Sequence, residues 1–153
     1  MNQGVDETSG LSSGGAVLVI DEDPEQLEFV RGVIQAIGYS VQACNSYAEG
    51  MRQLVSGAFD VVVVGQGGRS FEGRYVLESA GEFSRRLPVV VVARQLEMEC
   101  YLEAMQLGAV DYLAEPSVGV EIARVMRNLA PHRPARVAAA TLTSRPISEM
   151  PVA

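Results

Sequence analysis

Three acidic residues in a row, Asp21-Glu22-Asp23, directly follow the apolar stretch 16–20. Hard cations such as Mg²⁺ and Ca²⁺ prefer carboxylate oxygens, so this cluster could bind a divalent cation. A fourth carboxylate, Glu115, follows another apolar stretch and would enlarge the group to an acidic pocket if the fold brought the two together. The alternative is that these carboxylates are solvated or paired with Arg, and that Asp23 is a helix cap.

A glycine-rich run, residues 65–68, follows the apolar stretch Asp60–Val64. Such a run could bind a phosphate if several N–H groups converged at a helix N-terminus, usually beside a Lys. The chain has no Lys, because all twelve basic residues are Arg, and the next helical pattern starts only near Gly73. We therefore expect a flexible connection here and not a phosphate or nucleotide site.

Composition excludes several classes of protein. The chain has 153 residues, which suits one domain, and its net charge of −7 argues against binding to nucleic acid or to an anionic membrane. Cys44, Cys100 and the single histidine, His132, lack the spacing of a zinc site. Residues 1–15 do not read as a signal peptide, and no apolar run is long enough to span a membrane, so we expect a cytoplasmic protein.

Apolar stretches alternate with helical patterns five times. Such alternation predicts an α/β fold, with a parallel sheet covered by helices on both faces. The expected strands are residues 16–20, 39–43, 60–64, 88–93 and 110–114. The expected helices are residues 24–37, 46–57, 73–83, 96–107 and 118–129, with Ser117 capping the last, whose apolar face would carry Val120, Ile122, Val125, Met126 and Leu129. In such folds the functional crevice lies at the carboxyl ends of the strands.

The expected domain covers residues 15–130. Residues 1–14 are polar and rich in Gly and Ser, which is typical of a flexible segment. Residues 131–153 carry four of the seven prolines and many alanines without an apolar period, which predicts a disordered tail.

Four stretches of the chain resemble the receiver domains of two-component response regulators. They are 17–25 (VLVIDEDPE), 59–64 (FDVVVV), 87–92 (LPVVVV) and 108–116 (GAVDYLAEP). The resemblance covers roughly residues 15–130. It implies a flavodoxin-like, CheY-like doubly wound sheet of five parallel strands in the order 2-1-3-4-5.

The resemblance also implies a phosphorylation site, and this chain departs from it at three positions. In the family an Asp ending strand three accepts the phosphoryl group, while a Thr or Ser ending strand four and a Lys ending strand five hold its oxygens. Here these positions are Gly65, Ala93 and Glu115. Without a nucleophile, a hydroxyl or an ammonium group, we expect no aspartyl phosphate. The nearest other Asp, Asp60, lies at the opposite end of the strand, roughly 16 Å away.

Other family features are kept. The resemblance gives Asp21 and Glu22 as the acid pair that would hold Mg²⁺, and Tyr112 as a switch side chain or, alternatively, an ordinary half-buried tyrosine. Arg94 or Arg69 could form a salt bridge to Glu115 or Asp21 that substitutes for the missing cation.

The sequence therefore predicts a degenerate receiver, or pseudo-receiver, that is not an enzyme, needs no cofactor and signals independently of phosphorylation. It would bind a protein partner or a second copy of itself through a face that includes Tyr112, Tyr101 and Met105. An alternative is a sensor whose acidic crevice binds a small ligand or a divalent cation. A weaker alternative is a conventional phosphorelay receiver.

Overall fold

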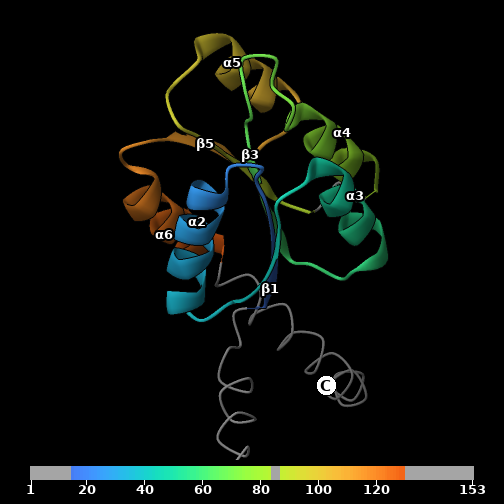
Figure 1. The fold of residues 1–153 in the computed structure, drawn as a ribbon, viewed down its shortest axis with the longest axis vertical. Coiled ribbons are helices and arrows are strands. Elements are labelled where there is room, and N and C mark those ends of the chain that lie inside the picture. The colour runs from blue at the N-terminus through green and yellow to red at the C-terminus, as the bar shows by residue number, and fades with distance from the viewer. Residues whose placement is uncertain (1–14, 84–86, 130–153) are drawn as a thin grey trace, which may run out of the picture.

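A five-stranded parallel sheet forms the centre of the protein (Figure 1). The computed structural model describes residues 15–83 and 87–129, so the predictions for the terminal segments 1–14 and 131–153 lie outside the described residues. The strand order is β2-β1-β3-β4-β5, as the resemblance implies. The strands are β1 (Ala16–Ile20), β2 (Ser40–Cys44), β3 (Val61–Gly65), β4 (Val89–Ala93) and β5 (Asp111–Ala114).

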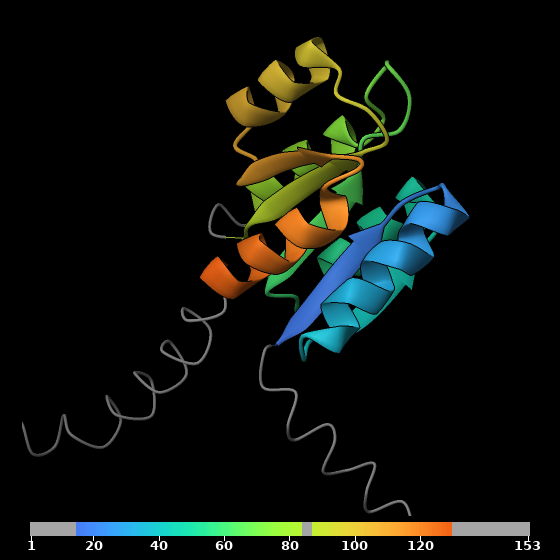
Figure 2. The ribbon, with the colours of Figure 1, turned by 90° about the vertical axis from the view of Figure 1, so that its left-hand side faces the viewer.

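Five helices cover the two faces of the sheet. They are α2 (Pro24–Ala36), α3 (Tyr47–Ser56), α4 (Arg74–Phe83), α5 (Met98–Gln106) and α6 (Val118–Leu129). Helices α2 and α6 pack over one face, and α3, α4 and α5 cover the other, which gives the molecule two hydrophobic cores (Figures 1 and 2). The valine side chains of β3 and β4 are buried on both faces, as expected for central parallel strands.

The predicted elements all exist, and their bounds differ from the predicted ones by at most two residues. Strands β2 and β3 each begin and end one residue later than predicted, and α5 begins at Met98, after the N-cap Glu97. The prediction that Val120 lies on the apolar face of α6 was wrong, because its side chain is 74% exposed. In the described part of the chain, no helix is long and apolar enough to cross a membrane.

Local hydrogen bonds explain where two of the helices begin. The Asp23 carboxylate accepts from the N–H of Glu25 (3.1 Å), so Asp23 caps α2 as predicted, and Pro24 occupies the first turn. The Ser46 hydroxyl accepts from the N–H of Glu49 (3.1 Å) and caps α3.

The predicted cap of α6 differs in the structure. The hydroxyl of Ser117 donates to the carbonyl of Ala114 (3.4 Å), and the backbone carbonyl of Ser117 accepts from the N–H of Glu121. The side chain of Ser117 thus bonds backward to β5, whereas its backbone begins the helix.

The loop after β3 is fixed by hydrogen bonds, in contrast to the flexible connection that the sequence predicts. The Glu72 carboxylate accepts from the N–H of Gly68 (2.7 Å) and from the hydroxyl of Ser70 (2.6 Å). Phe71 adopts a left-handed backbone (φ 58°), and its side chain is buried in the core on the α3–α5 face. The run of glycines is therefore part of an ordered turn.

Candidate functional site

A crevice of about 270 Å³ lies at the carboxyl ends of β1, β3 and β4. The turn between β1 and α2 forms one wall, the β3–α4 loop another, and the end of β4 the floor. Its lining residues are Asp21, Glu22, Asp23, Gln26, Tyr47, Gly67, Val92, Ala93 and Arg94. The structure thus brings together the residues after β1 and β4 that the sequence selected.

The carboxyl group of Asp21 fills the space that a side chain at position 65 would need. A Cβ atom built on Gly65 would lie 2.5 Å from Cγ and Oδ2 of Asp21 and 2.7 Å from its Oδ1. A Cβ atom essentially never makes contacts this short, so any larger residue at position 65 requires the side chain of Asp21 to shift. The carbonyl of Gly65 is also engaged, because it accepts a hydrogen bond from the Tyr47 hydroxyl (2.8 Å).

Asp21 is a buried carboxyl with an incomplete set of hydrogen-bond partners. Its Oδ1 accepts from the N–H of Asp23 (2.9 Å), whereas its Oδ2 has no hydrogen-bond partner among the residues that the structure describes. Burial raises the pKa of Asp21 from its ordinary value of 3.8 to about 6, because an ionised carboxylate is poorly solvated there. The hydrogen bond from Asp23 and the charge of Arg94 only partly offset this rise.

The predicted salt bridge from Arg94 or Arg69 to Glu115 or Asp21 does not form, because each Arg lies against a different carboxylate. Arg94 binds the carboxylate of Asp23 and lies 3.7 Å from that of Glu25, so it pairs with the first turn of α2. Arg69 is largely exposed and lies 3.6 Å from the carboxylate of Glu97, at the start of α5.

Glu115 is exposed and is not among the residues that line the crevice, so the predicted acidic pocket of Asp21, Glu22 and Glu115 is not formed as a unit. The side chain after β5 remains in solvent, whereas the side chains after β1 form the wall of the crevice.

The described residues fit a divalent cation poorly. A hard cation such as Mg²⁺ or Ca²⁺ needs several oxygen ligands at short distances. Across residues 15–83 and 87–129, no group of three or more acidic, Cys or His side chains is placed to hold a metal ion. Of the two predicted ligands, Asp21 faces the space beside Gly65 and Glu22 is exposed.

Gln66 and Tyr112 form a buried hydrogen-bonded pair that sequence reasoning missed. The Tyr112 hydroxyl donates to Oε1 of Gln66 and accepts from the N–H of Glu97 (3.2 Å). Tyr112 is only 7% exposed, so it is not a surface side chain. Its hydroxyl is fully engaged by the two hydrogen bonds. A polar residue directly after a fully apolar strand was the available signal, since its side chain had to find a partner at the crowded edge of the sheet.

The predicted partner face is apolar and exposed on α5. Tyr101 is half-buried and packs edge-to-face on Tyr112, with ring centroids 5.6 Å apart, whereas Met105 is 38% exposed. Four further exposed apolar side chains lie on α5 or in the segments that flank it: Leu96, Met98, Leu102 and Val110. We call these six residues the α5 face.

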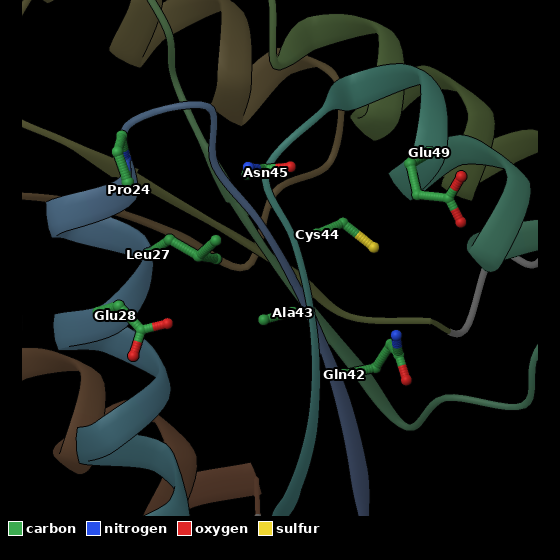
Figure 3. A pocket seen from close by; sticks show the side chains of 8 residues that line it. All are labelled: Pro24, Leu27, Glu28, Gln42, Ala43, Cys44, Asn45 and Glu49. Atoms are coloured by element: carbon green, nitrogen blue, oxygen red, sulfur yellow. The ribbon is translucent and has the colours of Figure 1, made fainter.

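A second, larger pocket of about 420 Å³ lies away from this site, between α2, β2 and α3 (Figure 3). Leu27 points from α2 toward β2, and Cys44 points toward α3 (Figure 3). Burial raises the pKa of the Cys44 thiol, which disfavours the reactive thiolate. The two carboxylates of this pocket, Glu28 and Glu49, are already paired with Arg31 and Arg52. The pocket therefore offers little chemistry.

The strand order and the crevice at the carboxyl ends of the strands define a doubly wound α/β domain, and comparison with known sequences gives the family. The chain belongs to the response regulator receiver domain family, whose model matches residues 17–130. It is 26% identical over 100 residues to the transcriptional regulatory protein ZraR of Escherichia coli, which corresponds to 65% of this chain and 23% of ZraR. It is 31% identical over 113 residues to the two-component response regulator ARR11 of Arabidopsis thaliana, covering 72% of this chain and 22% of that protein. The chain thus spans less than a quarter of the length of either relative.

Solved structures show the same fold. A CheY-like receiver domain protein from Methanospirillum hungatei JF-1 superposes with a TM-score of 0.70 at 17% identity, covering 79% of this chain and 97% of that one. A response regulator from Burkholderia pseudomallei that carries a phosphorylated aspartic acid and a calcium ion matches with a TM-score of 0.64 at 18% identity. That match covers 86% of this chain and 75% of the other. The prediction of a CheY-like sheet is confirmed.

Proposed function

We propose that this receiver domain signals without phosphorylation and without catalysis, through contacts with a protein partner. One observation carries the proposal. The position that corresponds to the phosphoryl acceptor is Gly65, and the carboxyl of Asp21 occupies the space where an acceptor side chain would stand. The domain therefore lacks the nucleophile, and a nucleophile placed at position 65 would have to displace the carboxyl of Asp21.

The neighbouring positions support the same conclusion. Ala93 ends β4 with a buried methyl group and can bond no phosphoryl oxygen. Glu115 follows β5 where the family has an ammonium group, and the change from cation to anion reverses the sign of the local field. Arg94 cannot replace that cation without leaving its pair with Asp23.

The α5 face is the surface that we propose for the partner. A small protein rarely leaves several large apolar side chains together on one helix unless they serve an interaction. Met98 (56% exposed) and Leu102 (51% exposed) lie on a helix whose inner side is already buried through Cys100 and Ala104, and Leu96 (56% exposed) directly precedes its N-cap. A second copy of the chain is the simplest occupant, because both copies present the same patch.

Intact-mass spectrometry after incubation with acetyl phosphate and Mg²⁺ tests the loss of phosphorylation. We expect no added phosphate on the wild-type protein and none on Gly65→Asp, because the new carboxylate would collide with Asp21 and would still lack the hydroxyl and the ammonium group. A receiver with an intact site should be labelled in parallel as a positive control.

A stoichiometric, acid-stable but hydroxylamine-sensitive phosphate on the wild-type chain would refute the proposal. A phosphate on Gly65→Asp alone would show instead that Ala93 and Glu115 do not prevent the reaction. In that case the loss of function would depend on position 65 only.

A second candidate is a sensor for a small polar molecule, and two unpartnered atoms favour it. Oδ2 of Asp21 and Nε2 of Gln26 are buried without a hydrogen-bond partner among the described residues, and both side chains line the crevice. A molecule that offers both a donor and an acceptor would satisfy them and would stabilise the fold in proportion to its occupancy. An ordered water could do the same, so we rank this candidate second.

A further inference from the structure

The side chain of Gln66 is held in a single position by its surroundings. Its backbone N–H donates to the carbonyl of Val92 (2.8 Å), and its own carbonyl accepts from the N–H of Gly73 (3.0 Å). The side-chain amide donates from Nε2 to the carbonyl of Gly68 (3.2 Å). Gln66 is 4% exposed, so its remaining amide oxygen is shielded from bulk solvent.

That oxygen faces the hydroxyl of Tyr112, and the donors and acceptors match in one arrangement only. The hydroxyl of Tyr112 accepts from the N–H of Glu97, so its proton is available to donate to Oε1 of Gln66. If the amide were turned over, its NH₂ group would meet the hydroxyl and its oxygen would meet the carbonyl of Gly68. The second contact places two acceptors against each other, which excludes this orientation.

Tyr112 in turn ties the start of α5 to the sheet. Glu97 is the N-cap of α5, and its side chain makes no capping hydrogen bond. Its own N–H donates to the hydroxyl of Tyr112, while the ring of Tyr101, one turn into the helix, packs on the ring of Tyr112. A chain of contacts thus runs from the residue after Gly65 to the α5 face.

We propose that Gln66 is a positioning residue that holds Tyr112 inward and thereby fixes the start of α5 and the α5 face in one arrangement. This inference rests on the proposed function, because it gives the means by which a domain without a phosphate keeps a single binding surface. The contact between Gln66 and Tyr112 is made by the residue directly after Gly65, and it forms without any phosphoryl transfer at position 65.

The test uses NMR of the full chain, labelled on the rings of its five tyrosines. The signal of Tyr112 is the one that is missing from the spectrum of Tyr112→Phe. Gln66→Met keeps the length and removes the acceptor. We expect the Tyr112 ring signal to move toward that of the exposed Tyr75, and the Glu97 amide to exchange about tenfold faster.

Gln26→Met is the matched control, because Gln26 is also a buried glutamine but its Nε2 has no partner. It should leave Tyr112 and Glu97 unchanged. The inference is overturned if Gln66→Met lowers thermal stability while the Tyr112 signal stays in place, since Gln66 would then only fill space.

These outcomes are separate from those of the phosphorylation test. An aspartyl phosphate on the wild-type chain would refute the proposed function whatever the Tyr112 signal does. An unchanged Tyr112 signal in Gln66→Met would refute only the role of Gln66.

Discussion

At the residue scale, Asp21 takes up the space that a glycine leaves free. Its carboxyl lies where a side chain at position 65 would stand. Asp21 is therefore buried, although it lines an open crevice. Only Oδ1 gains a hydrogen bond, from the N–H of Asp23. The cost of ionising this carboxyl should therefore appear in the pH dependence of stability.

We predict that Asp21 lowers the stability of the protein as the pH rises from about 4 to 6. The pKa of Asp21 is about 6 in the folded protein and 3.8 when it is free of burial, so the folded protein binds this proton more tightly than the unfolded chain does. The contribution is complete below pH 4 and is lost as the pH passes through 6. Urea unfolding should show Asp21→Asn gaining relative to the wild type across this window, by at most about 3 kcal/mol.

The control for this measurement is Glu78→Gln, which removes an exposed carboxylate on α4. Its unfolding free energy should follow that of the wild type at every pH. Parallel curves for Asp21→Asn and wild type between pH 4 and 6 would show that Asp21 is solvated and does not occupy the space beside Gly65.

The two parts of the site differ in how far the sequence could predict them. The identities of Gly65, Ala93 and Glu115 followed from their places after three strands, because strand ends are well determined by long valine runs. The pairing of Gln66 with Tyr112 did not follow, because it depends on side-chain direction across the width of two strands. The same limit explains the error at Arg94. The sequence predicts a salt bridge to Asp21 or Glu115, whereas the guanidinium binds Asp23, two residues after Asp21.

At the scale of elements, the start of α2 combines a local cap with a contact from a distant strand. The Asp23 carboxylate caps the helix through the N–H of Glu25 and also binds Arg94, which follows β4. The first interaction satisfies a helix N–H that has no partner within the helix. The second is an ion pair with an Arg side chain that is 63% exposed, and such pairs stabilise proteins little.

We therefore predict that the cap stabilises the protein more than the ion pair does. Asp23→Ala should lower the free energy of unfolding by about 1 kcal/mol, and Arg94→Ala by less than about half of that. Asp23→Asn is the matched variant, since it keeps the capping oxygen and loses the charge, and it should resemble Arg94→Ala in urea unfolding. A larger loss for Arg94→Ala than for Asp23→Ala would mean that the contact with β4, and not the cap, positions α2.

The elements themselves were well predicted because their signals are local. Asp23 with Pro24 and Ser46 with Glu49 mark helix starts within four residues, and unbroken apolar runs mark the buried strands. The error at Val120 has a different cause. Its apolar side chain fits a helical period, but only the packing of α6 against α2 decides which side of the helix is covered.

At the scale of the whole molecule, the two core clusters leave one helix with an uncovered apolar side. Helices α2 and α6 pack against each other, and α3 packs against α4, whereas α5 contacts mainly β5. The outer side chains of α5 thus lack the helix neighbour that the other pairs have. Figures 1 and 2 show α5 standing apart at one end of the molecule.

If a second copy covers the α5 face, a charge placed there should weaken self-association without affecting the fold. We predict that the wild-type protein sediments as a concentration-dependent dimer and that Leu102→Glu raises the dissociation constant at least about tenfold, because a carboxylate would be desolvated at the centre of the interface. Both proteins should unfold at similar urea concentrations, since Leu102 is half exposed in the monomer. Val55→Glu provides the matched control, because Val55 is also an apolar residue that is more than half exposed, but on α3, and it should leave the dimer intact. A wild-type protein that stays monomeric at hundreds of micromolar would exclude a second copy as the occupant, and the α5 face would then have to bind a different protein.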